Sequence, residues 1–191
     1  MHLLTVEEYA AFLKEEFAGV DPKFVSSIVF ERSELSDEDI RRVEQALDMG
    51  KLPSGFVDLL KEYDFGNLSL MNEQFGAEES GSLEWLLEYN DPNSYGFEDF
   101  IKGLKDNNLI IIANGDPFTI LMDVKTEKIY AVDNETPVEE RIPIANSFER
   151  FVEGMGTGFM AKRRKTTNEF LELARSEFGK DSMPFWQVAA Q

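Results

Sequence analysis

The sequence predicts a fold of helices arranged around a three-stranded antiparallel meander. The meander is indicated between Leu109 and Val132, where three apolar or alternating runs are joined by short turns. The helices are indicated on both sides of it by apolar residues three and four positions apart, several of them behind capping residues. The chain has 191 residues and no cysteine, so it is long enough to bury a core without disulfides.

Helical patterns are the main feature of the residues before the meander. Thr5-x-x-Glu8 and Ser36-x-x-Asp39 both have the form of a capping box at the start of an apolar stripe. The predicted helices are Thr5 to Phe17, the stretch from Ser36 to Gly50, the stretch from Pro53 to Gly66, a short helix capped by Ser82, and Phe97 to Leu104. Between them, Val25 to Phe30 fits either a strand or a short helix, and Asn67 to Phe75 is predicted to be strand and turn.

The meander itself is predicted as three consecutive strands. They are Leu109 to Ala113, Phe118 to Val124 and Lys128 to Val132. Turn chemistry separates them, first at Asn114-Gly115-Asp116-Pro117 and then at Lys125-Thr126-Glu127. The apolar faces of these strands and of the flanking helices predict a core that contains Phe56, Leu59, Leu60, Ile120, Met122, Phe148 and Phe151.

The residues after the meander predict two more helices. Ser147 caps the first, and Thr166-x-x-Glu169 opens the last. Between them, Gly154, Gly156 and Gly158 predict a flexible joint, because their spacing does not fit a dinucleotide-binding loop. The basic run from Lys162 to Lys165 is predicted to pair with acids of the chain or to form an exposed linker.

A charge gap is the most informative feature of the composition. The formal net charge is −18, and between Glu62 and Ile101 there are ten acids and no lysine or arginine. Aromatic residues are interleaved with these acids, which is not typical of a disordered acidic tail. Two readings stay open: a face that binds a basic protein, or a solvated face that only maintains solubility. The residues predicted to bind the partner are Glu73, Glu78, Glu79, Glu84, Trp85, Glu88, Asp91, Tyr95, Glu98 and Asp99.

The residue inventory also excludes several kinds of chemistry. The single histidine is His2, which leaves histidine-based triads and zinc sites without their key member. We therefore predict no enzyme, no cofactor and no metal. A carboxylate enzyme or a small-ligand protein that uses Asp116, Asp123 or Glu127 is kept as an alternative. The strong negative charge argues against nucleic acid and membrane partners, and the absence of a signal-like or membrane-spanning stretch predicts a cytoplasmic protein.

The order of several short motifs resembles the SUKH superfamily, the Smi/Knr-type domain. The motifs are Leu35-Ser36-Asp37-Glu38-Asp39-Ile40, Leu52-Pro53-Ser54-Gly55-Phe56 through Tyr63 to Gly66, Asn114-Gly115-Asp116, Ile120 to Val124, Lys128-Ile129-Tyr130, and Ser147-Phe148-Glu149-Arg150-Phe151. The resemblance covers roughly residues 33 to 153. The residues that carry it, with structural roles, are Leu52, Pro53, Phe56, Leu60, Tyr63, Gly66, Asn114, Gly115, Asp116, Asp123, Tyr130, Phe148 and Phe151.

The resemblance implies an α+β fold, with a central antiparallel sheet and helices packed around it. It also implies a division into residues 1–30 (a helix and its connection), 31–153 (the SUKH-like core domain) and 154–191 (a helical extension packed on the core). Bacterial members of the family look like immunity proteins that neutralise toxins, often nucleases, and fungal members look like regulators of cell-wall assembly. The prediction is therefore an immunity protein for a basic, nuclease-type toxin, with a regulatory scaffold as the alternative.

Overall fold

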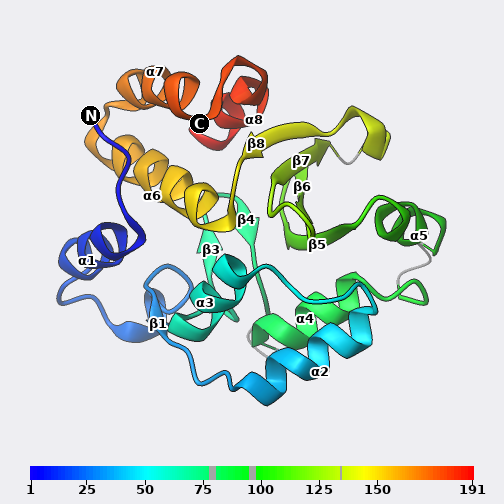
Figure 1. Cartoon of the computed structure of the whole chain (residues 1–191). Coiled ribbons are helices and arrows are strands. Elements are labelled where there is room, and N and C mark those ends of the chain that lie inside the picture. The colour runs from blue at the N-terminus through cyan, green and yellow to red at the C-terminus, as the bar shows by residue number, and fades with distance from the viewer. Residues whose placement is uncertain (78–80, 95–97, 134) are drawn as a thin grey trace.

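A six-stranded antiparallel sheet forms the centre of the molecule, an α+β fold (Figure 1). The computed structural model describes residues 1–77, 81–94, 98–133 and 135–191. The strands follow one another in chain order: β3 (Ser69–Leu70), β4 (Glu73–Gln74), β5 (Leu109–Asn114), β6 (Phe118–Asp123), β7 (Ile129–Asp133) and β8 (Ile142–Ala145). A separate short pair joins β1 (Glu31–Arg32) to β2 (Tyr63–Asp64).

The predicted meander is confirmed as β5, β6 and β7. Leu109 lies opposite Asp123 in the first antiparallel pair, and Phe118 lies opposite Asp133 in the second. The hairpin turns form at the two predicted places, residues 115–117 and 124–128. The third strand begins at Ile129 and runs one residue beyond Val132.

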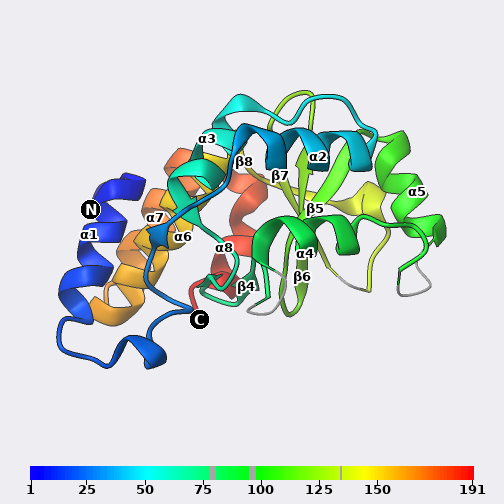
Figure 2. The same ribbon diagram turned by 90° about the horizontal axis from the view of Figure 1, so that it is seen from below.

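The helices before the meander also begin close to the predicted residues, but the helix predicted to end at Gly66 ends at Glu62, because Tyr63 and Asp64 form β2. These helices are α1 (Val6–Glu16), α2 (Asp37–Leu47), α3 (Ser54–Glu62), α4 (Gly81–Tyr89) and α5 (Glu98–Asp106). The capping boxes are present at Thr5 with Glu8 and at Ser36 with Asp39, whereas Thr166 precedes its helix without a side-chain cap hydrogen bond. The undecided stretch from Val25 to Phe30 is neither strand nor helix, because it continues a single 3₁₀ turn, η1 (Pro22–Phe24), as a series of turns. Figure 2 shows α2 and α4 next to each other, which agrees with their direct contacts.

The glycine-rich segment is not a flexible joint, and that prediction is wrong. Gly154, Gly156 and Gly158 lie inside α6 (Phe148–Arg164), and all three are buried. The glycines face aromatic rings, since a side chain on Gly154 would meet Trp186 and one on Gly156 would meet Tyr9. Close packing of neighbouring helices therefore requires them, and this packing outweighs their low helix propensity.

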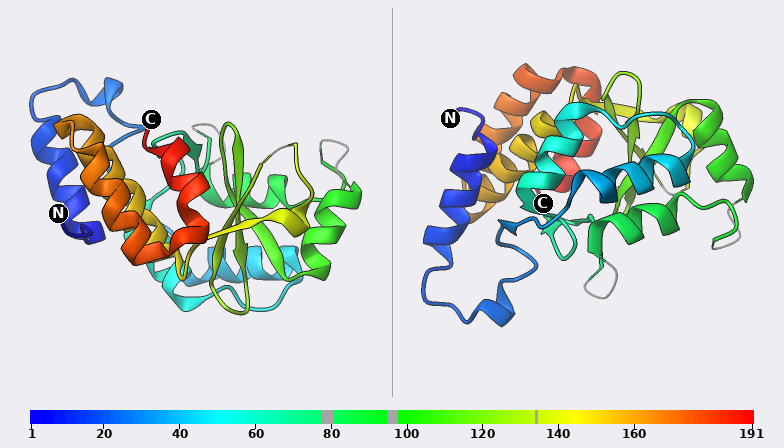
Figure 3. Two further views of the ribbon diagram at one scale, coloured as in Figure 1. Left: turned by 90° about the horizontal axis from the view of Figure 1, so that it is seen from above. Right: turned by 60° about the horizontal axis from the view of Figure 1, so that its bottom comes forward.

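Helix α6 is surrounded by elements from both ends of the chain (Figure 3). It contacts α1 on one side, and α7 (Thr167–Phe178) on another. The predicted last helix is followed by η3 (Lys180–Ser182) and by α8 (Met183–Ala189), which covers the edge strand β8. The Leu4 N–H donates to the buried Thr157 Oγ1 at 2.9 Å, which fixes the chain before α1 against α6.

The basic run ends α6, where its charges are favourable to the helix dipole. Arg163 Nε donates to Glu16 Oε1 at 3.0 Å, and its guanidinium lies 5.5 Å from the Phe17 ring centroid. Arg164 lies over the Phe12 ring in the same way. The internal pairing predicted for this run is therefore confirmed for Arg163, which ties α6 to α1.

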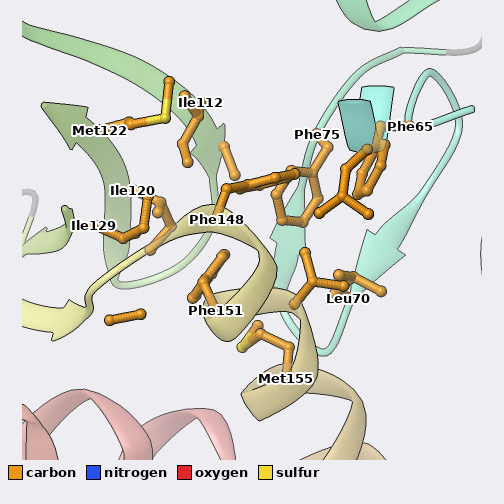
Figure 4. Close-up of a cluster of buried hydrophobic side chains, with 14 of the residues drawn as sticks. Phe65, Leu70, Phe75, Ile112, Ile120, Met122, Ile129, Phe148, Phe151 and Met155 are labelled. Atoms are coloured by element: carbon orange, nitrogen blue, oxygen red, sulfur yellow. The ribbon is translucent and has the colours of Figure 1, made fainter. Parts of the chain in front are cut away.

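The main core lies between the first face of the sheet and α6. Figure 4 shows Phe148 and Phe151 of α6 among the strand residues Ile112, Ile120 and Ile129 on one side and Phe75 and Leu70 on the other. All seven residues predicted for the core are buried, namely Phe56, Leu59, Leu60, Ile120, Met122, Phe148 and Phe151. The core is continuous with α7 and α8, because Phe170, Phe185 and Trp186 belong to the same cluster.

A second, smaller cluster covers the opposite face of the sheet. Leu109, Ile111, Leu121 and Val132 point to this side, because alternate residues of a strand point to opposite faces. They are covered by Trp85 of α4 and by Ile101 and Leu104 of α5. This face therefore carries a thinner layer than the face that contacts α6, and the candidate site lies on it.

Candidate protein-binding site

Two of the residues predicted to bind a partner are buried, which corrects their role. Trp85 is 4% exposed and its ring stacks on Tyr89, with 4.1 Å between centroids and 22° between planes. Its position in α4 places it against Ile101 and Leu104 of α5, so the ring holds the two helices to the sheet. It cannot anchor a partner in this structure.

Glu73 is the second correction, since its side chain is 2% exposed. The carboxyl lies under the β5–β6 turn, so close to Gly115 that a side chain there would meet Glu73 Oε2 at 2.5 Å. Within the described residues this oxygen has no hydrogen-bond partner. Burial raises the pKa of Glu73 to about 8, so the group is largely protonated at neutral pH and adds little charge to the surface.

The other acids that were predicted to bind the partner, where the structure describes them, are exposed on α4, α5 and the loop between them. They are Glu84, Glu88, Asp91, Glu98 and Asp99. Glu84 forms an ion pair with Arg42 of α2, so a cation from outside the gap partly balances its charge. Glu98 and Asp99 occupy the first turn of α5, where the helix dipole favours negative charge. Glu78, Glu79 and Tyr95 lie outside the described residues.

Asp91 is held in a fixed orientation at the end of α4. Its Oδ1 accepts hydrogen bonds from the backbone N–H and the side-chain amide of Asn93, each at 2.9 Å. These bonds lower the pKa of Asp91, and the ammonium of Lys105 on α5 adds to the effect. The loop after α4 therefore lies close to α5 and presents an ionised carboxylate there.

A pocket of about 460 Å³ opens between this loop, α5 and the second face of the sheet, and we call it the sheet pocket. Its volume lies within the range of small-ligand sites, about 300–1,000 Å³. The floor and one wall are apolar, formed by Ile101, Ile111, Val132 and Phe100. Tyr89, Ser94, Asn114, Thr119, Asp133 and Thr136 complete the lining.

Acidic residues occur in the segments that line the sheet pocket. Asp133 lines it, and Asp91, Glu98, Asp99 and Glu135 lie in the segments that form its walls; we call these five the acidic rim. No lysine, arginine or histidine is among the described lining residues. The nearest basic residues in the same segments are Lys102 and Lys105, which follow the lining residues along α5. The rim therefore presents a net negative charge around an apolar pocket.

The acids kept for an alternative enzymatic role do not converge. Asp123 Oδ1 accepts the backbone N–H groups of Lys125 and Thr126, at 2.8 and 3.1 Å, and so builds the β6–β7 turn. Glu127 is directed toward the start of α3, where a side chain on Gly55 would meet its Oε1 at 2.6 Å. Asp116 is exposed on the β5–β6 turn. Among the described residues there is no group of three side chains suited to hold a metal ion.

Comparison with protein families gives one match. The model of the SMI1 / KNR4 family (SUKH-1) matches residues 34–154, which is more than half of the chain. The chain belongs to the SUKH-1 family. A search of curated proteins found no match. This SUKH-type module is thus of a kind that is generally protein-binding and non-enzymatic, and often serves in toxin immunity.

The residues that carried the family resemblance divide between core and turns. Leu52, Phe56, Leu60, Tyr63, Gly66, Phe148 and Phe151 are buried. Asn114, Gly115, Asp116 and Asp123 form or flank the hairpin turns, Tyr130 is half-buried under the Arg141 guanidinium, and Pro53 precedes α3. These residues therefore have structural roles in the core and the turns. Of this set, Asn114 is the one that also lines the sheet pocket.

The sequence reasoning missed most of the pocket, including Thr119, Val132, Asp133 and Thr136. Thr119, Val132 and Asp133 belong to the meander and Thr136 follows it, so all four come well after the charge gap in the sequence. A signal was available at Asp133, because it is a carboxylate that ends a buried strand next to a turn.

Within the described part of the chain, each helix is too short or too polar to cross a membrane.

Proposed function

We propose that this SUKH protein is an immunity protein that binds and neutralises a basic toxin domain through the acidic rim and the sheet pocket. The observation that supports the proposal most directly is the acidic rim around an apolar concavity, within the matched family region. Interfaces combine an apolar centre with a polar or charged border, and the rim reproduces this arrangement on a concave face.

The charge of the rim suits a nuclease-type toxin. A nuclease binds phosphate with basic side chains, and an acidic protein surface can occupy the same basic site. Complementary charges also raise the association rate, by about 10–10³ over that of neutral surfaces. Rapid association is valuable to an immunity protein, because free toxin is harmful. The same charge argues against nucleic acid or an anionic membrane as the partner.

Charge reversal at the rim tests the proposal. The partner to use is the protein encoded by the neighbouring gene, with its binding rate measured by surface plasmon resonance at low and high salt. Asp91→Lys combined with Asp99→Lys and Glu135→Lys should slow association at least tenfold at low salt. The difference should shrink in high salt, because charges are screened over about 10 Å at 0.1 M.

A matched control separates the rim from net charge alone. Glu169→Lys, Glu172→Lys and Asp181→Lys make the same change of six charge units on α7 and η3, at the other end of the molecule (Figure 1). An equal effect of both triple variants would show that the rim is only a solvated face. Growth of cells that express the partner provides the second readout: binding without rescue of growth would favour the regulatory scaffold.

A further inference from the structure

We propose that the sheet pocket is a receptor for a single arginine side chain presented by the partner protein. The proposal rests on the proposed function in one respect, since the partner supplies the arginine. It goes further by assigning a chemical specificity to one cavity, which is testable without the partner.

The walls of the pocket fit the aliphatic stem of a long side chain. Ile101, Ile111 and Val132 are each 5% exposed or less, yet they line the cavity, so the remaining exposed atoms of these side chains face it. An occupant that covers them with CH₂ groups is stabilised, because each buried group removes apolar surface from water. A volume of about 460 Å³ holds such a stem together with part of the neighbouring backbone.

The polar end of the occupant is specified by Asp133. Its Oδ1 accepts the backbone N–H of Glu135 at 2.9 Å, which orients the carboxylate at the end of β7. No basic side chain among the described lining residues balances this charge. An anionic or purely apolar occupant would leave the carboxylate desolvated without a partner, which is unfavourable. The occupant must therefore carry a positive charge at the end of an apolar stem.

Arginine meets this requirement better than lysine. Its planar guanidinium donates two parallel hydrogen bonds to one carboxylate, while a lysine ammonium is a compact and more strongly hydrated charge. The guanidinium also stacks on aromatic rings, and Phe100 is part of the pocket wall. The acidic rim outside the pocket favours the approach of the same charge.

The test uses three short peptides that differ at one position. Acetyl-Gly-Gly-Arg-Gly-Gly-amide, its lysine version and its citrulline version are titrated into the ¹⁵N-labelled full chain, and amide shifts are followed by NMR. Citrulline keeps the size and shape of arginine without its charge. We expect the arginine peptide to shift the amides of Ile101, Ile111 and Val132, with a dissociation constant on the order of 1 mM. We expect the other two to bind at least about tenfold more weakly.

Variants of the full chain complete the test. Asp133→Asn should weaken the arginine peptide about tenfold, because the amide keeps the turn but loses the charge. Asp123→Asn is its matched control, since Asp123 makes the same kind of turn and lies outside the pocket lining, and it should bind normally. Thr136→Trp fills the pocket from an exposed position and should abolish binding.

Three results would overturn the proposal: equal binding of the arginine and citrulline peptides, equal binding of arginine and lysine, or shifts that avoid the pocket. The outcome is separate from that of the proposed function. A chain that binds the arginine peptide at the pocket and neutralises no toxin keeps this inference and loses the immunity role. A chain that neutralises a toxin equally well with Asp133→Asn keeps the immunity role and loses this inference.

Discussion

Replacing Gly156 by alanine should destabilise the protein, although this change usually stabilises a helix by about 1 kcal/mol. The new methyl group would overlap the Tyr9 ring, reaching 2.5 Å from Cδ1 and 3.0 Å from Cδ2. The ring has little room to move, because Tyr9 is 1% exposed and packs edge-on against Phe30 at 5.6 Å and beside Phe159 at 6.2 Å. The close contact between α1 and α6 therefore depends on the missing side chain.

The expected loss follows from two opposing effects. Overpacking of a core costs about 1–3 kcal/mol, and a ring that is held by neighbouring aromatics belongs at the upper end. After subtraction of about 1 kcal/mol for the better helix propensity, the net loss is about 2 kcal/mol. For a chain of this length the melting temperature should fall by roughly 4–8 °C, measured by circular dichroism.

Gly103→Ala is the matched control, because Gly103 lies inside α5 and a side chain there meets nothing within 4 Å. It should raise the melting temperature by roughly 2–4 °C. Tyr9→Leu combined with Gly156→Ala should lose less than the sum of the two single changes, because the clash is removed with the ring. If Gly156→Ala melts at or above the temperature of the parent protein, the helices are not in close contact and the reasoning is refuted.

Three further changes test the packing and the buried acid. Trp186→Ala should lower the free energy of unfolding in urea by about 3–5 kcal/mol, because its fully buried ring packs on Phe170 and Phe178. Trp85→Ala should cost a similar amount, and a loss below about 1 kcal/mol would place that ring at the surface after all. Glu73→Gln should flatten the pH dependence of stability. Because the pKa of Glu73 is raised from 4.5 to about 8 on folding, the folded state keeps a proton that the unfolded state releases, so the parent protein loses up to about 1.4 kcal/mol per pH unit between those values. The free energy of unfolding in urea is measured at pH 5 and at pH 8. An equal change between the two pH values in the parent protein and in Glu73→Gln would contradict this prediction.

The features that could be predicted from the sequence are those determined by neighbouring residues. The alternation in Phe118 to Val124 and the turn residues around Asn114 and Asp123 specify the meander, because each strand pairs with the next one in the chain. The two capping boxes are equally local. The motif order also predicted the family, whose match begins and ends within one residue of the predicted range.

The wrong predictions concern residues whose role depends on distant partners. Three glycines in five residues indicate a weak helix, but in α6 they receive the rings of Tyr9 and Trp186, which no local pattern reveals. Trp85 and Glu73 lie among exposed acids in the sequence, yet α5 covers one and the β5–β6 turn covers the other. The sheet pocket is formed by residues that are spread along the chain from Tyr89 to Thr136. Its apolar floor could therefore only be predicted as core.

The burial of α1 against α6 has a consequence for how the chain is made. Leu4, whose N–H donates a hydrogen bond, and Thr157, whose hydroxyl oxygen accepts it, are 153 positions apart. At about 5–20 residues per second, a ribosome needs roughly 8–30 s to add the residues that separate them. Throughout this interval Val6, Tyr9 and Leu13 of α1 have no α6 to cover them. Helix α1 is therefore synthesised well before the helix that covers it, and its apolar face stays uncovered by α6 until α6 has been made.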